Sequence, residues 1–450
     1  MLEVRRESHS TKARGGDGAG TLCCMARIAI VGAGQAGLFL GFGLLEDGHE
    51  VTLFSEQSSD ELLNGRLPSG MGLFEDAVKK EAALGLPNWE DVMTRGEGAI
   101  LELLNPDGSI GLHIEPPVPR PHRGVDQRLK NSRWMRELER RGAAVRVVAL
   151  ATPDDLDRHT AGHDLVVVAT GKGALSSLFA RDAQRSPFDV PQRHLIGLHV
   201  KNFRPDLRSG TIRVLPGVGE VVITPFYSRE QLKGRFILLE GIPGGPLDQF
   251  PRELSGHALW KACQRTVREL IPGQLEDLKE AELISEQCWL RGGITPTVRQ
   301  PVGRLASGRV ALGLGDALML HDPLAAQGGN NATHMADFYR SRIREHAGQP
   351  FTAEWMQRTF DDFWQVYGQY AMGVTAGLLM PPAPHQRAVL VSAHHVPAVA
   401  TALINGLYDP RALFPWFVDP SVTRGFLASQ GVPPALLEQL SSLPQGPASA

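Results

Sequence analysis

Cysteine is scarce in this chain, and its spacing excludes two common roles. The 450 residues hold 4 cysteines. Cys23 and Cys24 are adjacent, whereas Cys263 and Cys288 stand alone, so the sequence has no CxxC spacing of a zinc or redox site. So few cysteines do not make a disulfide framework in a chain of this length. We therefore expect inert, buried thiols in a reducing cytoplasm.

The sequence also lacks strong net charge, long apolar runs and a metal-binding pattern. Its formal net charge of −3 offers no broad basic surface for nucleic acid. No apolar run approaches the roughly twenty residues needed to span a bilayer, so we expect no membrane segment. His394 and His395 are neighbours whose side chains would point in different directions on a helix, so we expect no metal site. A hydrophobic content of 42% and a charged content of 21% fit a soluble globular enzyme.

Residues 1–24 lack the apolar core of a secretory signal. They are polar and glycine-rich, and Met25 stands two residues before the first expected strand. We expect residues 1–24 to be a disordered extension or a translation artefact, with Met25 as a candidate natural start. A targeting arm is the alternative.

The most informative segment that is present runs from Arg27 to Phe54, where a strand, a glycine turn, a helix and a second strand follow one another. Arg27–Val31 is a β-branched apolar run typical of a buried parallel strand. Gly32, Gly34 and Gly37 then give GxGxxG. The first glycine allows the tight turn, the second lets the backbone approach a pyrophosphate, and the third lets the helix pack on the strand. The free N–H groups of the helix start would face the anion, so the segment predicts a dinucleotide site rather than a plain glycine-rich turn.

The first part of the chain is predicted to be a Rossmann-like, FAD-binding domain. It covers residues 25–186 and includes a β-hairpin at 98–114 around Pro106-Asp107-Gly108. Residues 126–142 are expected to form an amphipathic helix with arginines on its outer face. Residues 164–170 are expected to form another buried strand of the same sheet.

The rest of the chain changes its periodicity twice. Longer alternating strands and a helix near 256–270 predict a sheet-based substrate-binding domain over residues 187–300. Residues 301–350 return to the FAD-binding domain with a strand at 309–315 and a helix from about 329. Residues 351–450 form a helical C-terminal region. The expected fold class is therefore α/β, with an inserted sheet-based domain and a helical end.

Two more strand ends favour FAD over NAD. One strand ends in Thr170-Gly171, the other ends in Gly315-Asp316, and Gln327–Asn330 is predicted to be a turn before a helix. An aspartate in such a place can accept a ribitol or ribose hydroxyl, and glycines before a helix expose N–H groups to phosphate or to the polar edge of a flavin. An ordinary strand-to-helix loop is the alternative for the last segment alone.

Several stretches together resemble a known family. They are RGVDQRL (123–129), DLVVVATGKGAL (164–175), SPFDVPQR (186–193), GGITPTVR (292–299) and GLGDA (313–317) followed by DPLAAQGGNNA (322–332). With the glycine turn, they resemble flavin-dependent monooxygenases of the aromatic hydroxylase fold. The chain is more closely similar to the oxygenase components of styrene and indole monooxygenases. The likeness covers about residues 26–430.

The resemblance implies bound FAD. Its pyrophosphate would lie at Gly32–Gly37, its ribityl chain near Asp316, and its isoalloxazine ring against Pro323 and the Gln327–Asn330 turn. The expected cofactor-binding residues are Gly32, Ala33, Gly34, Ala36, Gly37, Ser55, Glu56, Arg66, Arg123, Thr170, Gly171, Gly315, Asp316, Pro323, Gln327, Gly328, Gly329 and Asn330.

Four of these residues are not part of the glycine motifs. By resemblance, Arg66 and Arg123 would lie near the cofactor. Many FAD proteins end the second strand in an acid that binds ribose, and here Ser55 takes that place with Glu56 next to it. The close family also has a small hydroxyl residue followed by an acid there.

The expected substrate pocket departs from the family. After Arg66 the family has an asparagine and a histidine at the oxygen-transfer site, and Ser69 and Leu73 stand at those positions here. With Met71, they predict a more apolar and larger cavity, although core packing is an equal alternative for Met71 and Leu73. By resemblance, Pro296 would face the flavin ring.

The chemistry implied by the resemblance needs little side-chain acid or base. Reduced flavin reacts with molecular oxygen at C4a, and the (hydro)peroxide transfers oxygen to an electron-rich double bond, ring or sulfur. The protein positions the substrate and excludes water. The expected function is an FAD-dependent monooxygenase that epoxidises or hydroxylates an aromatic or alkene substrate. No side chain is singled out as a catalytic acid or base.

The sequence contains one convincing dinucleotide fingerprint. Gly217-Val218-Gly219 precedes a strand without a helix and is predicted to be a hairpin turn. We therefore expect a separate flavin reductase to supply reduced FAD. The alternatives are a single-component NAD(P)H-dependent hydroxylase, another FAD-dependent oxidoreductase such as a reductase or halogenase relative, and a non-catalytic binding protein. The halogenase motif WxWxIP is missing, and the family suggests a homodimer.

Overall fold

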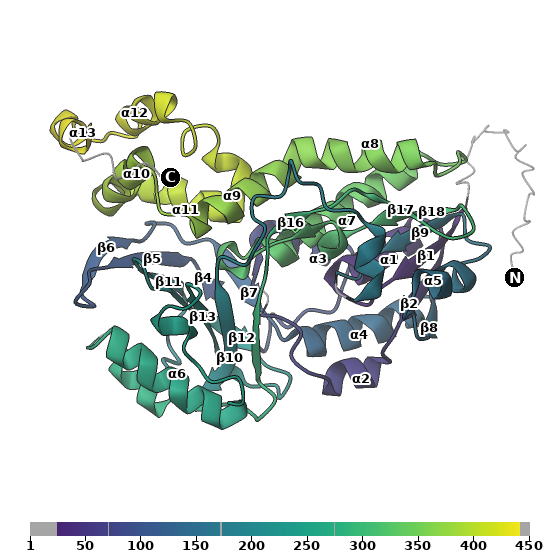
Figure 1. The fold of residues 1–450 in the computed structure, drawn as a ribbon, viewed down its shortest axis with the longest axis horizontal. Helices are drawn as coiled ribbons and strands as arrows, with labels where there is room; N and C mark the ends of the chain where they lie inside the picture. The colour runs from purple at the N-terminus through teal and green to yellow at the C-terminus, as the bar shows by residue number, and fades with distance from the viewer. Residues whose placement is uncertain (1–24, 71, 172, 274, 442–450) are drawn as a thin grey trace, which may run out of the picture.

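The six-stranded sheet that carries the glycine turn forms one side of the molecule (Figure 1). The computed structural model describes residues 25–70, 72–171, 173–273 and 275–441. The strand order is β17-β18-β9-β1-β2-β8, and all neighbours except β17 and β18 run parallel. The carboxyl ends of the parallel strands therefore meet at one edge, where folds of this kind bind ligands. The strands are β1 (Arg27–Val31), β2 (Glu50–Ser55), β8 (Ala144–Val147), β9 (Leu165–Val168), β17 (Val302–Arg304) and β18 (Val310–Gly313).

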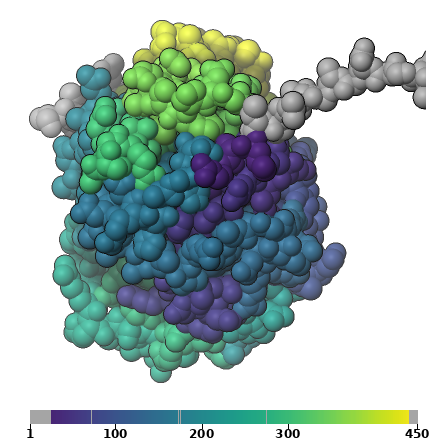
Figure 2. All heavy atoms as spheres, turned by 90° about the vertical axis from the view of Figure 1, so that its right-hand side faces the viewer, coloured from purple at the N-terminus to yellow at the C-terminus, as the bar shows by residue number. Residues whose placement is uncertain are grey.

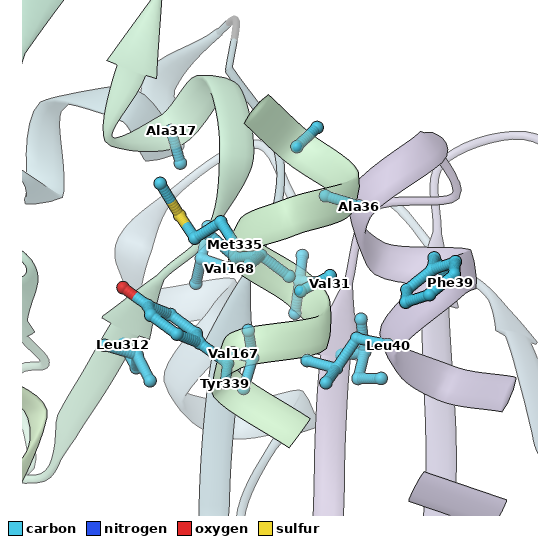
Figure 3. Packing of buried hydrophobic residues seen from close by; sticks show 14 of the residues in the cluster. Val31, Ala36, Phe39, Leu40, Val167, Val168, Leu312, Ala317, Met335 and Tyr339 are labelled. Atoms are coloured by element: carbon cyan, nitrogen blue, oxygen red, sulfur yellow. The ribbon is translucent and has the colours of Figure 1, made fainter. Parts of the chain in front are cut away.

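Helices cover this sheet and close its core. They are α1 (Gln35–Glu46), α2 (Ser59–Asn64), α4 (Gln127–Arg140), α5 (Pro153–His159) and α7 (Gln327–Glu345), and α3 (Glu75–Ala83) packs beside α7. Figure 3 shows Met335 and Tyr339 of α7 facing Val167 and Leu312 of the sheet, with Leu40 of α1 beside them. These apolar side chains are removed from water, which holds the N-termini of α1 and α7 at the same edge of the sheet.

The eight-stranded sheet has two differently covered faces. Its order is β14-β10-β13-β12-β11-β5-β6, with β15 paired to β10. Alternate residues of a strand point to opposite faces. Ile237 and Leu239 pack with Leu259 of α6 (Gly256–Leu270), whereas Phe236 and Leu238 lie on the other face. The strands are β5 (Ala99–Leu104), β6 (Ile110–Ile114), β10 (His194–Lys201), β11 (Gly210–Leu215), β12 (Gly219–Tyr227), β13 (Lys233–Gly241), β14 (Glu282–Leu283) and β15 (Trp289–Gly293).

The predicted hairpin at 98–114 is confirmed as β5–β6, and the structure adds where it pairs. β5 runs parallel to β11, so this early segment contributes two strands to the second sheet. The turn at Gly217–Gly219 joins β11 to β12 as an antiparallel hairpin, as predicted.

The C-terminal helices cover the β5–β6 hairpin. α10 (Pro384–His395) and α11 (Pro397–Tyr408) share an apolar cluster with Leu101, Leu103 and Ile114 of the hairpin. Figures 1 and 2 show these green and yellow segments on top of the earlier part of the chain. The remaining helices here are α8 (Ala353–Phe363), the π-helical η6 (Trp364–Gly368), α9 (Gln369–Leu379), η7 (Pro410–Leu413), α12 (Pro420–Ser429) and α13 (Pro434–Ser441).

Short elements connect these layers. A three-stranded sheet of β3 (Gly72–Phe74), β7 (Pro121–Gly124) and β4 (Gly96–Glu97) lies beside α3, and β16 (Thr297–Val298) pairs with β19 (Met319–Leu320). The short helices are η1 (Ala174–Leu178), η2 (Pro246–Asp248), η3 (Glu276–Glu280), η4 (Gly315–Ala317) and η5 (Pro323–Ala325).

Among the described residues, no single helix is long and apolar enough to cross a membrane. The one pair that meets the criteria together, α10 and α11, is bent by 119°.

Three local expectations need correction. The segment Gln327–Asn330 is not a turn before the helix but the first turn of α7, because Ala326 takes a left-handed conformation with φ 52° and starts the helix earlier. Arg128 of α4 does not point outward: it is buried against Asp126, with Nη2 to Oδ2 at 2.6 Å. The strand expected at 309–315 ends at Gly313, and Gly315-Asp316 belong to η4.

The two described cysteines behave as expected. Cys263 and Cys288 are free and buried, and burial raises the pKa of Cys263 to about 12. A thiol with a raised pKa is a poor nucleophile at neutral pH. Cys23 and Cys24 lie outside the described residues.

Candidate active site

A cavity of about 1210 Å³ runs from the glycine turn of the first sheet to the apolar face of the second. Small-molecule pockets usually measure roughly 300–1000 Å³, so this cavity has room for a cofactor and a substrate together. We call the end beside the six-stranded sheet the flavin half and the end beside the eight-stranded sheet the substrate half.

The glycine turn has the geometry that the sequence predicted. Gly32 has φ 117°, a left-handed conformation that favours glycine. A Cβ on Gly37 would lie 2.2 Å from the carbonyl oxygen of Gly32, so helix and turn pack in direct contact. A Cβ on Gly34 would meet no described atom within 4 Å, and Gly34 borders the cavity. The turn is thus tightly packed at Gly37 and open to a ligand at Gly34.

Two helix N-termini point their free N–H groups at the flavin half. α1 starts after Gly34 and α7 starts after Ala326, and both residues border the cavity. In the described part of the chain, neither helix has a side-chain cap or an acidic residue in its first turn. Such N-termini attract anionic groups of a ligand.

Polar residues at the strand ends complete this half. Ser55, Glu56, Thr170, Gly171 and Asp316 all border the cavity. The Ser55 hydroxyl donates to the carbonyl of Gln57 at 2.7 Å, so it is engaged in its own turn, whereas Glu56 is exposed. A Cβ on Gly171 would lie 2.3 Å from Cβ of Asp316, which explains a glycine there. Thr170 Oγ1 is buried and makes no hydrogen bond to a described residue, as expected of a ligand-facing atom.

Other predicted residues fall inside or outside this lining. Ala33, Ala36, Arg66, Ser69, Pro323, Gly328 and Gly329 border the cavity, whereas Gly37, Arg123, Gly315, Gln327, Asn330, Leu73 and Pro296 are not among the described residues that do. Arg123 instead forms an ion pair with Glu90. Leu73 is buried in a small cluster with Ala77 and Val78, which supports the core-packing alternative. Met71 lies outside the described residues.

The side chains of Gln327 and Asn330 hold elements together. Gln327 Nε2 donates to the carbonyl of Leu407 at 2.9 Å, which ties α7 to α11. Asn330 Nδ2 donates to Gly72 at 3.0 Å, and Asn330 Oδ1 accepts from the N–H of Phe74 at 2.8 Å. These amides position the first turn of α7 rather than lining the cavity.

Sequence reasoning assigned no role to three lining residues of α4. Gln127, Arg128 and Asn131 border the cavity, and Gln127 donates to the hydroxyl of Ser69. Arg128 Nη1 is buried and has no described partner. The stretch RGVDQRL carries part of the family likeness, but helical periodicity alone predicts its second arginine on the outside.

Apolar side chains dominate the substrate half. The ring of Phe236 packs closely on two glycines: a Cβ on Gly70 would lie 2.1 Å from it and a Cβ on Gly197 would lie 2.8 Å from it. Other lining residues of this half are Phe74, Ala99, Leu195, Ile212, Val222, Leu238, Leu290 and Leu407. Arg291 also borders it, but its Nη1 donates to the carbonyl of Pro251 at 2.9 Å. A neutral, apolar ligand fits such walls.

Two histidines that border the cavity are held neutral. Burial lowers the pKa of His122 to about 4 and that of His321 to about 3. His321 Nδ1 lies 3.0 Å from the hydroxyl of Thr375, and His122 Nε2 lies 2.9 Å from that of Thr224. These rings are therefore uncharged hydrogen-bonding groups at neutral pH.

Comparisons with known proteins agree with this geometry. Residues 171–276 match the family described as "Styrene monooxygenase A putative substrate binding domain". Over 332 residues the chain is 31% identical to styrene monooxygenase StyA of Pseudomonas fluorescens, which covers 71% of this chain and 78% of that protein. A solved flavoprotein/dehydrogenase of Cytophaga hutchinsonii aligns with a TM-score of 0.61 at 13% identity, over 93% of this chain and 99% of that one. The flavin-dependent halogenase CmlS aligns with a TM-score of 0.56 at 17% identity over 82% of this chain, which spans only 64% of the halogenase.

The match to styrene monooxygenase, on this fold and with this glycine-lined cavity, thus defines a flavin-dependent enzyme. Within that class the chain belongs to the styrene monooxygenase family, as its sequence had suggested, and it is a flavin-dependent monooxygenase.

Proposed function

We propose that this chain uses FAD to transfer one oxygen atom of O2 to a neutral aromatic or alkene substrate. The observation that carries the proposal is the continuous cavity between the two sheets, polar and glycine-lined at one end and apolar at the other. A flavin in the first half and a substrate in the second would share one enclosed space.

The hydrogen-bond donors and acceptors of the flavin half match the polar groups of FAD. The uncapped N-termini of α1 and α7 offer N–H groups to the pyrophosphate and to the polar edge of the flavin ring. Glu56 and Asp316 are the acceptors for ribose and ribityl hydroxyls. Thr170 Oγ1 is buried without a hydrogen-bond partner among the described residues, so it can bond to the cofactor. Arg66 supplies a cation on the same wall. The roles of these residues are part of the proposal.

The protein's own residues position the substrate and keep water out. Bound, reduced flavin supplies the activated oxygen. Phe236, Leu238 and Leu290 offer an apolar wall that orders a ring by contact alone. The neutral His122 and His321 avoid placing a charge beside an uncharged ligand. The reaction therefore depends on placement more than on a side-chain acid or base.

We further propose that a separate flavin reductase delivers the reduced FAD. The hairpin geometry of Gly217–Gly219 supports this, because a dinucleotide-binding turn leads into a helix. Anaerobic mixing of the FAD-loaded protein with NADH or NADPH tests it. The flavin absorbance should stay unchanged until a flavin reductase is added. Rapid bleaching without reductase would instead identify a single-component hydroxylase.

A further inference from the structure

A chain of polar groups crosses the substrate half at one place. It joins the carbonyl of Arg120, the hydroxyl of Tyr408, the ring of His122 and the hydroxyl of Thr224. Tyr408 comes from α11, His122 from β7 and Thr224 from β12, so three distant parts of the sequence meet there. His122, Thr224 and Tyr408 all border the cavity.

The ring of His122 packs beside two glycines. A Cβ on Gly96 would lie 2.2 Å from His122 Nε2, so the ring packs directly on that backbone. A Cβ on Gly210 would lie 3.4 Å from Cε1 of the ring and 3.6 Å from Thr224 Oγ1. Its contacts with the two hydroxyl groups orient the ring, with Nε2 toward Thr224 and Nδ1 toward Tyr408.

The direction of each hydrogen bond follows from the number of protons. Tyr408 has one hydroxyl proton and donates it to the carbonyl of Arg120 at 2.7 Å. It then has only lone pairs for His122 Nδ1 at 3.5 Å, so Nδ1 carries the ring proton. A neutral imidazole has no second N–H, hence Nε2 accepts, and the Thr224 hydroxyl donates to it at 2.9 Å.

Thr224 is left with lone pairs and no spare proton. Its side chain is half-buried and borders the cavity, so these lone pairs are within reach of a ligand. The site can accept a hydrogen bond from a substrate, but it cannot donate one without breaking the chain of four groups.

We propose that Thr224 Oγ1 accepts a hydrogen bond from the substrate, so that the preferred substrates are neutral aromatic alkenes carrying an O–H or N–H donor. This inference rests on the monooxygenase function proposed above. It makes Thr224 a specificity-determining residue, with His122 and Tyr408 as positioning residues that set the direction of its hydrogen bond. A polar site of this kind discriminates strongly against an analogue that lacks the matching group.

Substrates of one shape but different hydrogen-bonding character test the inference. The FAD-loaded enzyme with chemically reduced FAD would be offered vinylphenol, methylstyrene and methoxystyrene, each as meta and para isomers. For one isomer, kcat/KM should be about tenfold higher for vinylphenol than for methylstyrene, chiefly through KM. Methoxystyrene only accepts hydrogen bonds, so its kcat/KM should be no higher than that of methylstyrene.

Variants of Thr224 test whether its hydroxyl causes the preference for vinylphenol. Thr224→Val keeps the shape and removes the hydroxyl, so the preference for vinylphenol should fall to about one, whereas Thr224→Ser should keep it. Thr211→Val on β11 is the matched control, because Thr211 pairs with Ile223, which faces α6. If Thr224→Val does not fold, the inference is decided by the kcat/KM ratio of vinylphenol to methylstyrene in the wild type and in Thr224→Ser.

The outcomes separate the two proposals. If the wild-type enzyme oxidises no vinyl aromatic at all, the proposed function fails. If it oxidises all three probes with equal kcat/KM, or favours methoxystyrene, the function stands and the inference about Thr224 is overturned. An unchanged preference in Thr224→Val would overturn it as well.

Discussion

The carboxyl groups of Glu240 and Asp322 lie next to each other, fully buried, where β13 meets the loop before α7. Glu240 lies on the cavity-facing side of β13, two residues from Leu238, and Asp322 precedes the cavity-lining Pro323. Glu240 Oε1, Glu240 Oε2 and Asp322 Oδ2 have no hydrogen-bond donor among the described residues. Two buried carboxyl groups without donors can lie side by side only if one of them keeps a proton, which the other can then accept. The pair therefore links the substrate sheet to the loop before α7 through a retained proton.

The surrounding charges favour retention of that proton. Arg193 is committed to Glu220 by two contacts of 2.7 and 2.9 Å. Burial, followed by the neighbouring charge of Asp322, raises the pKa of Glu240 well above its usual range. Burial also raises the pKa of Asp322. We infer that Glu240 is the neutral partner.

This pair predicts that stability falls as pH rises above the unfolded pKa of a glutamate, about 4.3. A raised folded-state pKa contributes stability below the unfolded pKa and loses it as pH rises through the folded value. Glu240→Gln keeps a donor for Asp322 but cannot ionise. It should therefore be more stable than the wild type by about 1–3 kcal/mol at alkaline pH. Urea unfolding across the pH range measures this difference. Glu220→Gln, which breaks the pair with Arg193, should destabilise at every pH and serves as the control.

Buried histidines predict the opposite behaviour in acid. Burial lowers the pKa of His122, His199 and His334 to about 4 and that of His321 to about 3, whereas an unfolded histidine has a pKa of about 6.5. The unfolded chain then binds protons that the folded chain excludes, so stability should fall as pH drops below about 6.5. Each histidine should contribute on the order of 2 kcal/mol at about pH 5.

His199→Phe tests this acid dependence at one position. His199 has no exposed surface and packs against the rings of Phe226 and Phe236. The variant should flatten the loss of stability between neutral and acidic pH, measured by urea unfolding. An unchanged slope would contradict a neutral His199. His395→Gln, at an exposed histidine, is the surface control.

The glycine turn offers a matched pair of substitutions. Gly34→Ala adds a methyl group to open space at the cavity, so the protein should fold normally and lose at least tenfold in FAD affinity. Gly37→Ala places the same methyl group 2.2 Å from a carbonyl oxygen and should destabilise the fold by about 1–3 kcal/mol. Thermal unfolding and fluorescence titration with FAD separate the two effects. If Gly34→Ala and the wild type bind FAD with equal affinity, this turn does not contact the cofactor.

The packing of Phe236 against Gly70 should control pocket size. Gly70→Ala would place a methyl group 2.1 Å from the ring, so the ring must move. Because Phe236 borders the substrate half, we expect the displaced ring to narrow it, and KM for a bulky vinyl aromatic should rise about tenfold relative to a small one. The double substitution Gly70→Ala with Phe236→Leu should restore the pocket, and a double-mutant cycle measures the coupling. If the effects of the two substitutions on KM simply add, Gly70 and Phe236 do not set the pocket size together.

The sequence could predict the parts of the site that depend on local backbone geometry. Gly32, Gly34 and Gly37 lie in one short strand-turn-helix unit, whose spacing specifies its conformation before any distant contact forms. The strands β10 to β13 and helix α6 were likewise readable from periodicity.

The substrate half could not be predicted in this way, because distant segments assemble it. Thr224, His122 and Tyr408 have no sequence relation to one another and meet only in the folded chain. Arg128 was expected on the outside, since helical periodicity does not reveal that Asp126 would bury its charge. Leu73 occupies a predicted pocket position, but it packs instead with Ala77 and Val78 of α3.

Transfer of oxygen from O2 to a vinyl aromatic is the central claim, and one measurement tests it most directly. The purified protein would be mixed anaerobically with chemically reduced FAD and styrene, without NAD(P)H or reductase, and then exposed to isotope-labelled O2. Mass spectrometry should find one labelled oxygen atom in the organic product, and Gly34→Ala should form much less of it at limiting FAD. Labelled hydrogen peroxide with no oxygenated product, from wild-type protein that demonstrably binds FAD, would contradict the account.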